Sequence, residues 1–128
     1  MQFFKDIFYL FFPEVCLACK YQLLKNEYVI CTSCRHGFPQ TNFTSESNNL
    51  LEKQFYGRVM IKEATALFYF HKKGKIQQLI HELKYKNHQE IGTILGNWLG
   101  EDLLKSERFK NLDFIISVPL HAKKRNII

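Results

Sequence analysis

The stretch "CLACKYQLLKNEYVICTSC", residues 16–34, contains all four cysteines of the 128-residue chain. They form two Cys-x-x-Cys pairs separated by eleven residues. Two residues between the cysteines of a pair let both sulfurs reach one ion. Between the pairs, polar turn residues precede β-prone Tyr28, Val29 and Ile30, which predicts a hairpin as in a zinc ribbon. The spacing predicts a closed, structural Zn²⁺ site with four ligands: Cys16, Cys19, Cys31 and Cys34.

Two other uses of the cysteines were weighed. Two disulfides suit an exported domain, but the start of the chain has Asp6, no basic lead and no small-residue cleavage site. A redox motif needs only one Cys-x-x-Cys pair. We therefore expect a cytoplasmic protein whose thiols stay reduced and bind metal. His36 is an alternative ligand, although with four cysteines present a solvated histidine is favoured.

Composition sets broad limits on the fold and on the partners. The chain is 46% hydrophobic and contains 12 phenylalanines, which is enough for a packed core. Its formal net charge of +6 suits anionic ligands such as phosphates or nucleic acid without demonstrating either.

The chain divides into four segments. Residues 1–15 predict an amphipathic helix, because Phe4, Phe8 and Phe12 recur at helical spacing, and we expect it to pack on the protein without stable membrane insertion. Residues 16–38 are the zinc ribbon. Residues 39–50 are polar and predict a linker, and residues 51–128 form the remaining domain.

The last segment alternates between strand and helix patterns. Residues 63–70 predict a strand, residues 76–83 carry apolar side chains at helical spacing, and a second helix is expected at residues 88–105. Residues 112–120 have the continuous apolar character of a buried strand. This order predicts the truncated start of an α/β, Rossmann-like domain.

These residues resemble a known family. The runs "LIHELKYKNHQEIGTILGNWLG" and "IISVPLHAKK", behind "FPEVCLAC", resemble the ComF family, the competence-protein-F-like phosphoribosyltransferases. The resemblance covers essentially the whole chain. It implies a zinc ribbon followed by a type I phosphoribosyltransferase domain, and a link to DNA uptake during natural competence, with single-stranded DNA and other competence proteins as partners.

The resemblance also implies a site. Full-length relatives bind phosphoribosyl pyrophosphate (PRPP) with Mg²⁺, and their loop after Val-Pro-Leu-His meets the pyrophosphate. Here that loop would comprise Pro119, Leu120, His121, Lys123, Lys124 and Arg125. Cations beyond the carboxyl end of a strand are well placed for an anion. A solvated, basic terminus is the equally weighted alternative.

The chain departs from the family pattern after these basic residues. It ends in "RNII", and the family's acidic pair with its following hydroxyl residues and glycine, the PRPP-binding loop, is absent. Glu101 and Asp102 are adjacent but belong to a predicted helix and lack that glycine cradle. We therefore expect an incomplete, N-terminal portion that does not complete phosphoribosyl transfer alone, so that no catalytic residue is assigned.

A binding module is the alternative from a different functional class. Lysines are interleaved with aromatic residues around residues 68–86, a combination that pairs phosphate contacts with base stacking. Lys84 and Lys86 are the candidate nucleic-acid contacts. A solvated face over an aromatic core is the simpler interpretation of any one of these residues.

Overall fold

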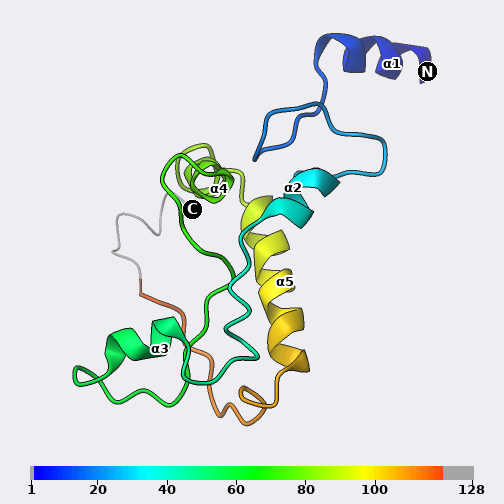
Figure 1. The fold of residues 1–128 in the computed structure, drawn as a ribbon. Coiled ribbons are helices and arrows are strands. Elements are labelled where there is room, and N and C mark those ends of the chain that lie inside the picture. Colours follow the sequence, from blue (N-terminus) through cyan, green and yellow to red (C-terminus); the bar gives the residue numbers. More distant parts are fainter. Residues whose placement is uncertain (1, 120–128) are drawn as a thin grey trace. The chain divides into compact units, whose positions relative to one another are not determined.

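The computed structural model describes residues 2–119. Within them, five helices are joined by irregular chain, and Figure 1 shows coiled ribbons without strand arrows. The helices are α1 (Gln2–Phe11), α2 (Thr32–Gly37), α3 (Leu50–Phe55), α4 (Lys75–Tyr85) and α5 (Glu90–Lys105). The periodicity that predicted helices near residues 76–83 and 88–105 is confirmed by α4 and α5.

The predicted α/β architecture is wrong. Helices account for 42% of the structure and strands for 3%, with no sheet among the described residues. Strand pairing in this part of the chain is limited to isolated bridges, Val15 with Gln22, Tyr28 with Ile30 and Gln40 with Phe68. The Rossmann-like start of a phosphoribosyltransferase domain is therefore not formed, and neither is the extended hairpin of a zinc ribbon.

The apolar run at residues 112–119 explains part of this error. Phe114, Ile115 and Ile116 are 84%, 92% and 88% exposed. A strand buried on both faces needs neighbouring strands for its backbone groups and helices for its side chains. The described residues provide neither neighbouring strands nor covering helices for this run, so it stays extended and exposed.

The run at residues 63–70 fails as a strand for a different reason. The backbone amide of Ala64 donates to the carboxylate of Glu52 at 3.1 Å, and its carbonyl accepts from the side-chain amide of Asn49 at 3.0 Å. These side chains thus form the hydrogen bonds that the backbone would otherwise form with a neighbouring strand. Only Phe68, near the end of the run, pairs with another segment as a strand does.

The chain forms two compact units, each made of two segments. The first unit combines the chain up to Thr41 with Phe68–Ile94, and the second combines Asn42–Leu67 with the chain from Leu95 onwards. The first unit therefore contains α1, α2, α4 and the beginning of α5, and the second contains α3 and the rest of α5. Residues 42–49, within the predicted linker, belong to the second unit and include the buried Phe43 and Asn49.

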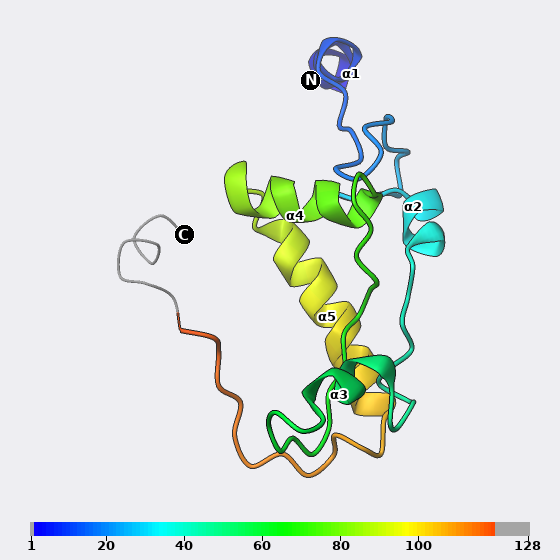
Figure 2. The same cartoon turned by 60° about the vertical axis from the view of Figure 1, so that its left-hand side comes forward.

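The core of the first unit is apolar and rich in sulfur. Leu79 of α4 and Ile91 of α5 are fully buried, as is Ile30 beside the second cysteine pair. Phe38 and Phe68 meet edge to face with ring centroids 5.3 Å apart. Figure 2 shows α5 starting beside the C-terminal end of α4 and running in a different direction. Helix α1 is present as predicted, but none of its residues is buried.

The second unit is organised by polar side chains. Asn49 caps α3 by accepting from the amide of Glu52 at 3.0 Å, and the Glu52 carboxylate accepts from the amide of Asn48 at 2.7 Å. This reciprocal arrangement resembles a capping box. The Arg108 guanidinium binds the carboxylates of Glu52 and Glu63 and donates to the carbonyl of Phe43 at 2.6 Å.

Candidate metal centre

The first cysteine pair lies on a tight turn. The amide of Lys20 donates to the carbonyl of Cys16 at 2.8 Å, and Lys20 has a left-handed backbone with φ of 67°. The Cys16 sulfur accepts from the amides of Ala18 at 3.4 Å and Cys31 at 3.3 Å. Such N–H···S bonds stabilise a negatively charged sulfur and orient it.

The second pair lies at the start of a short helix. Cys31 is the N-cap of α2 in an extended conformation, and its sulfur accepts from the amide of Cys34 at 3.4 Å. The backbone then turns into the helix, where the amide of Arg35 bonds the carbonyl of Cys31 at 3.1 Å. The sequence predicted two turns joined by a hairpin. The structure has one turn and one helix start, which bring the same four residues together.

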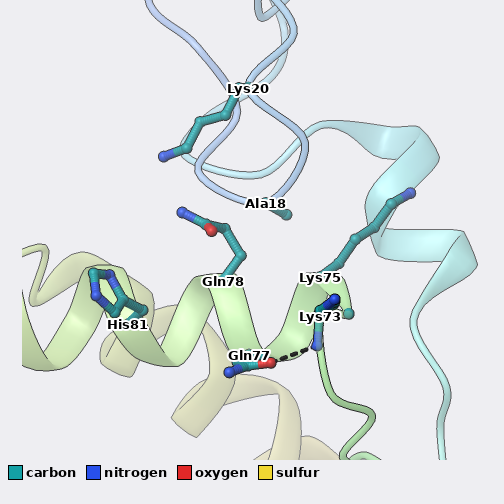
Figure 3. A pocket seen from close by; sticks show the side chains of 8 residues that line it. Ala18, Lys20, Lys73, Lys75, Gln77, Gln78 and His81 are labelled. Atoms are coloured by element: carbon teal, nitrogen blue, oxygen red, sulfur yellow. Dashed lines mark hydrogen bonds between the residues drawn. The ribbon is translucent and has the colours of Figure 1, made fainter.

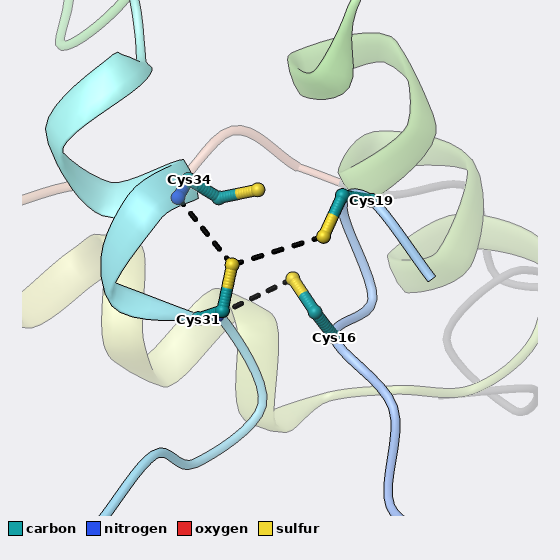
Figure 4. Close-up of side chains that lie close together, drawn as sticks. All are labelled: Cys16, Cys19, Cys31 and Cys34. Carbon is teal, nitrogen blue, oxygen red and sulfur yellow. Dashed lines mark hydrogen bonds between the residues drawn. The ribbon is translucent and has the colours of Figure 1, made fainter. Parts of the chain in front are cut away.

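The four sulfurs converge on one point (Figure 4). All of them lie within 4.8 Å of one another, and the sulfurs of Cys19 and Cys31 are 3.7 Å apart. A tetrahedral ion with metal–sulfur bonds of about 2.3 Å needs sulfur pairs about 3.8 Å apart. A disulfide needs about 2.05 Å. All four cysteines are free in this structure, and the cluster is compatible with a structural metal site.

The pKa values of the cysteine thiols are shifted in different directions. Burial raises the pKa of Cys16, but the backbone amides of Cys31, Cys19 and Ala18 outweigh it and lower that pKa to about 7. Burial raises the pKa of the Cys34 thiol, and its neighbouring sulfurs raise it further. Burial likewise raises the pKa of Cys31, against the opposing amide of Cys34. A divalent cation at the centre would favour the thiolate form of all four.

The remaining predicted site residues are not brought to this cluster. His36 is exposed and is not among the converging ligands. Pro119 is exposed, and the rest of the predicted pyrophosphate loop lies outside the described residues: Leu120, His121, Lys123, Lys124 and Arg125. Lys84 is exposed on α4, and Lys86, just after α4, pairs with Glu82 at 3.2 Å.

Sequence reasoning missed a cavity of about 380 Å³ beside the first cysteine turn. Its cationic lining comes from Lys20, Lys73 and Lys75, together with His81. Part of the signal was visible in the sequence, because the basic run "HKKGK", residues 71–75, leads into α4 and ends on its first residue. The proximity of this basic run to Lys20 could not be predicted from the sequence, because about fifty residues of chain separate the two segments.

Comparison with known proteins leaves the resemblance untested. No protein-family model, no curated protein and no solved structure matches the chain. The ComF resemblance therefore stays a prediction from the sequence motifs. Among the described residues, none of the helices is both long enough and apolar enough to span a bilayer.

Proposed function

We propose that Cys16, Cys19, Cys31 and Cys34 bind one structural Zn²⁺ ion that holds the first unit together. The observation that carries this proposal is the convergence of the four sulfurs within 4.8 Å. Four thiolates are soft ligands that suit zinc in a tetrahedral site. Because the protein supplies all four ligands, no position is open for water or substrate, and the ion would stabilise the fold without catalysing a reaction.

We further propose that this zinc-ordered chain is a ComF-like protein. The support is the order of motifs along the sequence, from "FPEVCLAC" through "LKYK" to "VPLHAKK". Phosphoribosyl transfer is not proposed for this chain, because residues 2–119 form no sheet. Mg²⁺ and PRPP therefore concern only a full-length relative. A role in competence is what the resemblance contributes, and a cytoplasmic location is proposed because four reduced thiols suit a reducing compartment.

Metal analysis of purified protein tests the zinc proposal. We expect about one zinc per chain, a shell of four sulfurs in X-ray absorption, and the visible spectrum of a tetrahedral thiolate site after replacement by Co²⁺. Protein produced with zinc in the medium that contains no metal would overturn the proposal. Two native disulfides found by mass spectrometry would overturn it as well.

Binding of single-stranded nucleic acid is a second candidate function. It is favoured by an exposed aromatic pair on α4, where the rings of His81 and Tyr85 lie 5.0 Å apart and Tyr85 is 75% exposed. Lys84, the residue before Tyr85 in α4, is also exposed. An exposed ring next to a cation suits base stacking combined with a phosphate contact. Lys86 contributes less to such a surface, since it pairs with Glu82.

Fluorescence anisotropy with a labelled single strand tests this candidate. We expect affinity to fall as salt rises, because displaced counterions drive part of the binding. Tyr85→Ala should weaken binding by removing the stacking platform, and Lys84→Glu should weaken it and lower the salt dependence. Tyr56→Ala, which removes a tyrosine exposed elsewhere, is the matched control. Equal binding by Tyr85→Ala and the control would reject the candidate.

A further inference from the structure

The four cysteines of the cluster differ in how far solvent reaches them. Cys16 and Cys34 are 0% and 1% exposed, and Cys31 is 8% exposed. Cys19 alone among the four is not buried. The two residues that flank Cys19 also line the cavity of about 380 Å³ beside α4 (Figure 3). A small reagent in solution therefore reaches the turn at Cys19 before it reaches the other three thiols.

The four sulfurs also differ in their hydrogen bonds. The amides of Ala18 and Cys31 donate to the sulfur of Cys16 at 3.4 and 3.3 Å, and the amide of Cys34 donates to the sulfur of Cys31 at 3.4 Å. Each of these bonds draws on a lone pair of the sulfur, which makes it a weaker nucleophile. Within residues 2–119, no backbone amide donates to the sulfur of Cys19 or of Cys34. Since Cys34 is buried, only Cys19 combines an accessible sulfur with lone pairs that no amide engages.

A second thiol lies within reach of Cys19. The sulfurs of Cys19 and Cys31 are 3.7 Å apart, and Figure 4 shows them pointing toward one another. A disulfide needs a separation of about 2.05 Å, so a small movement of the two side chains would close the gap. Cysteines that respond to oxidants are typically accessible and lie next to a resolving cysteine. Cys19 and Cys31 together have both features.

We propose that Cys19 is the oxidation site of the cluster, that Cys31 is its resolving thiol, and that hydroperoxides are the class of oxidant. The inference rests on the proposed zinc site, because metal binding keeps the thiols deprotonated. The Cys19 thiolate attacks one peroxide oxygen, so that an S–O bond forms, the O–O bond breaks and hydroxide leaves. The Cys31 thiolate then attacks the sulfur of Cys19, so that the S–S bond forms, the S–O bond breaks and a second hydroxide leaves.

The two steps balance in atoms and electrons. Two thiolates, one hydrogen peroxide and two protons give one disulfide and two waters, and two electrons pass from the sulfurs to the peroxide oxygens. The bridge removes two of the four ligands, and the remaining two thiolates do not complete a tetrahedral site. Oxidation therefore releases zinc. A dithiol reductant returns the two electrons and restores the ligands.

The effect of oxidation extends to α4. The ammonium of Lys20, the residue after Cys19, lies 2.5 Å from the carboxylate of Glu82 on α4. Both residues belong to the first unit. Once the ion no longer fixes the turn, the position of Lys20 is less restricted and this ion pair weakens. The oxidised first unit should therefore be less stable than the reduced, zinc-bound one.

Treatment of the zinc-loaded protein with hydrogen peroxide tests the proposal. Zinc release is followed with a metal-binding dye, and the cysteines are mapped by alkylation and peptide mass spectrometry. We expect zinc to be released in step with formation of a Cys19–Cys31 bridge. Zinc content is measured before the oxidant is added, so absence of zinc at that point rejects the metal site itself. A full complement of zinc that peroxide does not release rejects only the oxidation site.

Two histidine variants compare the accessible thiol with a buried one. Cys19→His keeps a set of four ligands, because three cysteines and one histidine also form structural zinc sites, but it has no thiol at the accessible position. It should lose zinc roughly tenfold more slowly than wild type. Cys34→His makes the same change of ligand at a buried position. It should stay sensitive and lose zinc within about threefold of the wild-type rate.

The remaining outcomes each decide one part of the proposal. Equal rates in the two histidine variants would overturn Cys19 as the oxidation site. A wild-type bridge within either Cys-x-x-Cys pair would overturn Cys31 as the resolving thiol, and this map decides even where a histidine variant binds no zinc. Loss of zinc that a dithiol and added zinc do not reverse would mean oxidation beyond the disulfide and would overturn the two-step reaction.

Discussion

The two units of the chain are held together by different kinds of side chain. In the first, the buried residues are mostly apolar or cysteine, and Leu79 and Ile91 are fully buried. In the second, four of the five buried residues that the structure describes are polar, namely Thr44, Asn49, Glu52 and Ser106. Small units bury too little apolar surface to be stable on that basis alone. One unit adds a cluster of four cysteines that is compatible with a structural metal site, and the other adds a network of hydrogen bonds and ion pairs.

The polar network of the second unit is centred on Arg108. Its guanidinium donates to the carbonyls of Phe43 and Glu46, each at 2.6 Å, and pairs with the carboxylates of Glu52 and Glu63. The hydrogen bond from the amide of Ala64 is the main cause that lowers the pKa of Glu52, and the charge of Arg108 adds to it. This comparison predicts that removal of a bound metal should destabilise the first unit. Loss of a polar side chain from the Arg108 network should destabilise the second.

Cys19→Ser should have the largest effect of any single change. It removes one of four ligands, and a structural zinc site of this kind contributes about 10–16 kcal/mol of binding free energy to folding. We expect loss of zinc and collapse of the NMR signals of Leu17, Ile30 and Leu79, whereas those of Thr44, Asn49 and Ser106 persist. A chelator should act on the wild-type protein in the same way.

Ser33→Ala is the matched control, because Ser33 lies between Cys31 and Cys34 but is exposed and is not a ligand. It should keep its zinc and its spectrum. If Cys19→Ser abolishes the signals of both units in one transition, the units are not independently stabilised and the comparison fails.

Arg108→Met should cause the second-largest loss of stability, and this loss should be confined to the second unit. Removing one member of a buried ion-pair network typically costs about 3–5 kcal/mol, because the partner charges stay buried. Arg108→Lys should recover part of the loss, since lysine keeps the charge but cannot donate from a planar fork. Denaturant unfolding followed by NMR would measure both, with zinc content unchanged.

Arg58→Met serves as the control, because Arg58 is exposed on the same unit. Its effect should stay within about 0.5 kcal/mol. A loss of metal in the Arg108→Met variant would contradict the assignment of Arg108 to the second unit alone.

The metal cluster and two long helices could be predicted because their signals are local. The spacing Cys-x-x-Cys places two sulfurs together whatever surrounds them. Apolar side chains at helical spacing, such as Ile76 and Leu79, indicate a helix together with the face that becomes buried, and α4 confirms both. Even so, the connection between the cysteine pairs was predicted as a hairpin, and the second pair instead begins α2.

The absence of a sheet among residues 2–119 could not be predicted, because an apolar run shows the capacity to form a strand but not whether a partner strand is present. Ile115 and Ile116 have that capacity and remain exposed. The backbone of Ala64 is bonded by side chains of Asn49 and Glu52, a possibility that strand propensity does not consider. Arg108 pairs with Glu52 across 56 positions of sequence, and no local pattern encodes that contact.

Glu82→Gln should cause an intermediate loss of stability in the first unit. The folded pKa of about 2 lies below the ordinary value of 4.5, so the ionised carboxylate stabilises the fold above about pH 4.5 and loses this contribution as pH falls toward 2. The difference in pKa corresponds to roughly 3 kcal/mol as an upper bound, since Lys20 and Lys86 are half-exposed. Urea unfolding at several pH values would measure it.

Only the difference between wild type and variant is informative here, because acid also protonates thiolates and releases metal. That difference should be greatest near neutral pH and shrink below pH 4.5. Glu101→Gln, which changes an exposed carboxylate of α5, should show no such dependence. A Glu82→Gln variant as stable as wild type at pH 7 would show that the buried carboxylate does not stabilise the first unit.

Asn49→Ala should have the smallest of these effects, on the second unit. The Asn49 side chain caps α3 and also donates to the carbonyls of Phe43, Glu46 and Ala64 at 3.3, 3.0 and 3.0 Å. Loss of an N-cap costs about 1–2 kcal/mol, and carbonyls left without a donor add to it. Thermal unfolding should show the decrease, whereas Asn97→Ala on an exposed position of α5 should be nearly neutral.

Asn49→Ser separates the two roles of this side chain. Serine is as good an N-cap as asparagine, but it is shorter and has a single donor for three carbonyls. If the network holds the second unit, Asn49→Ser should recover less than half of the stability that Asn49→Ala loses. Full recovery would mean that only the helix cap matters. Negligible loss in both variants would mean that the second unit does not depend on its polar interior, and the contrast with the cysteine-rich first unit would then have to be abandoned.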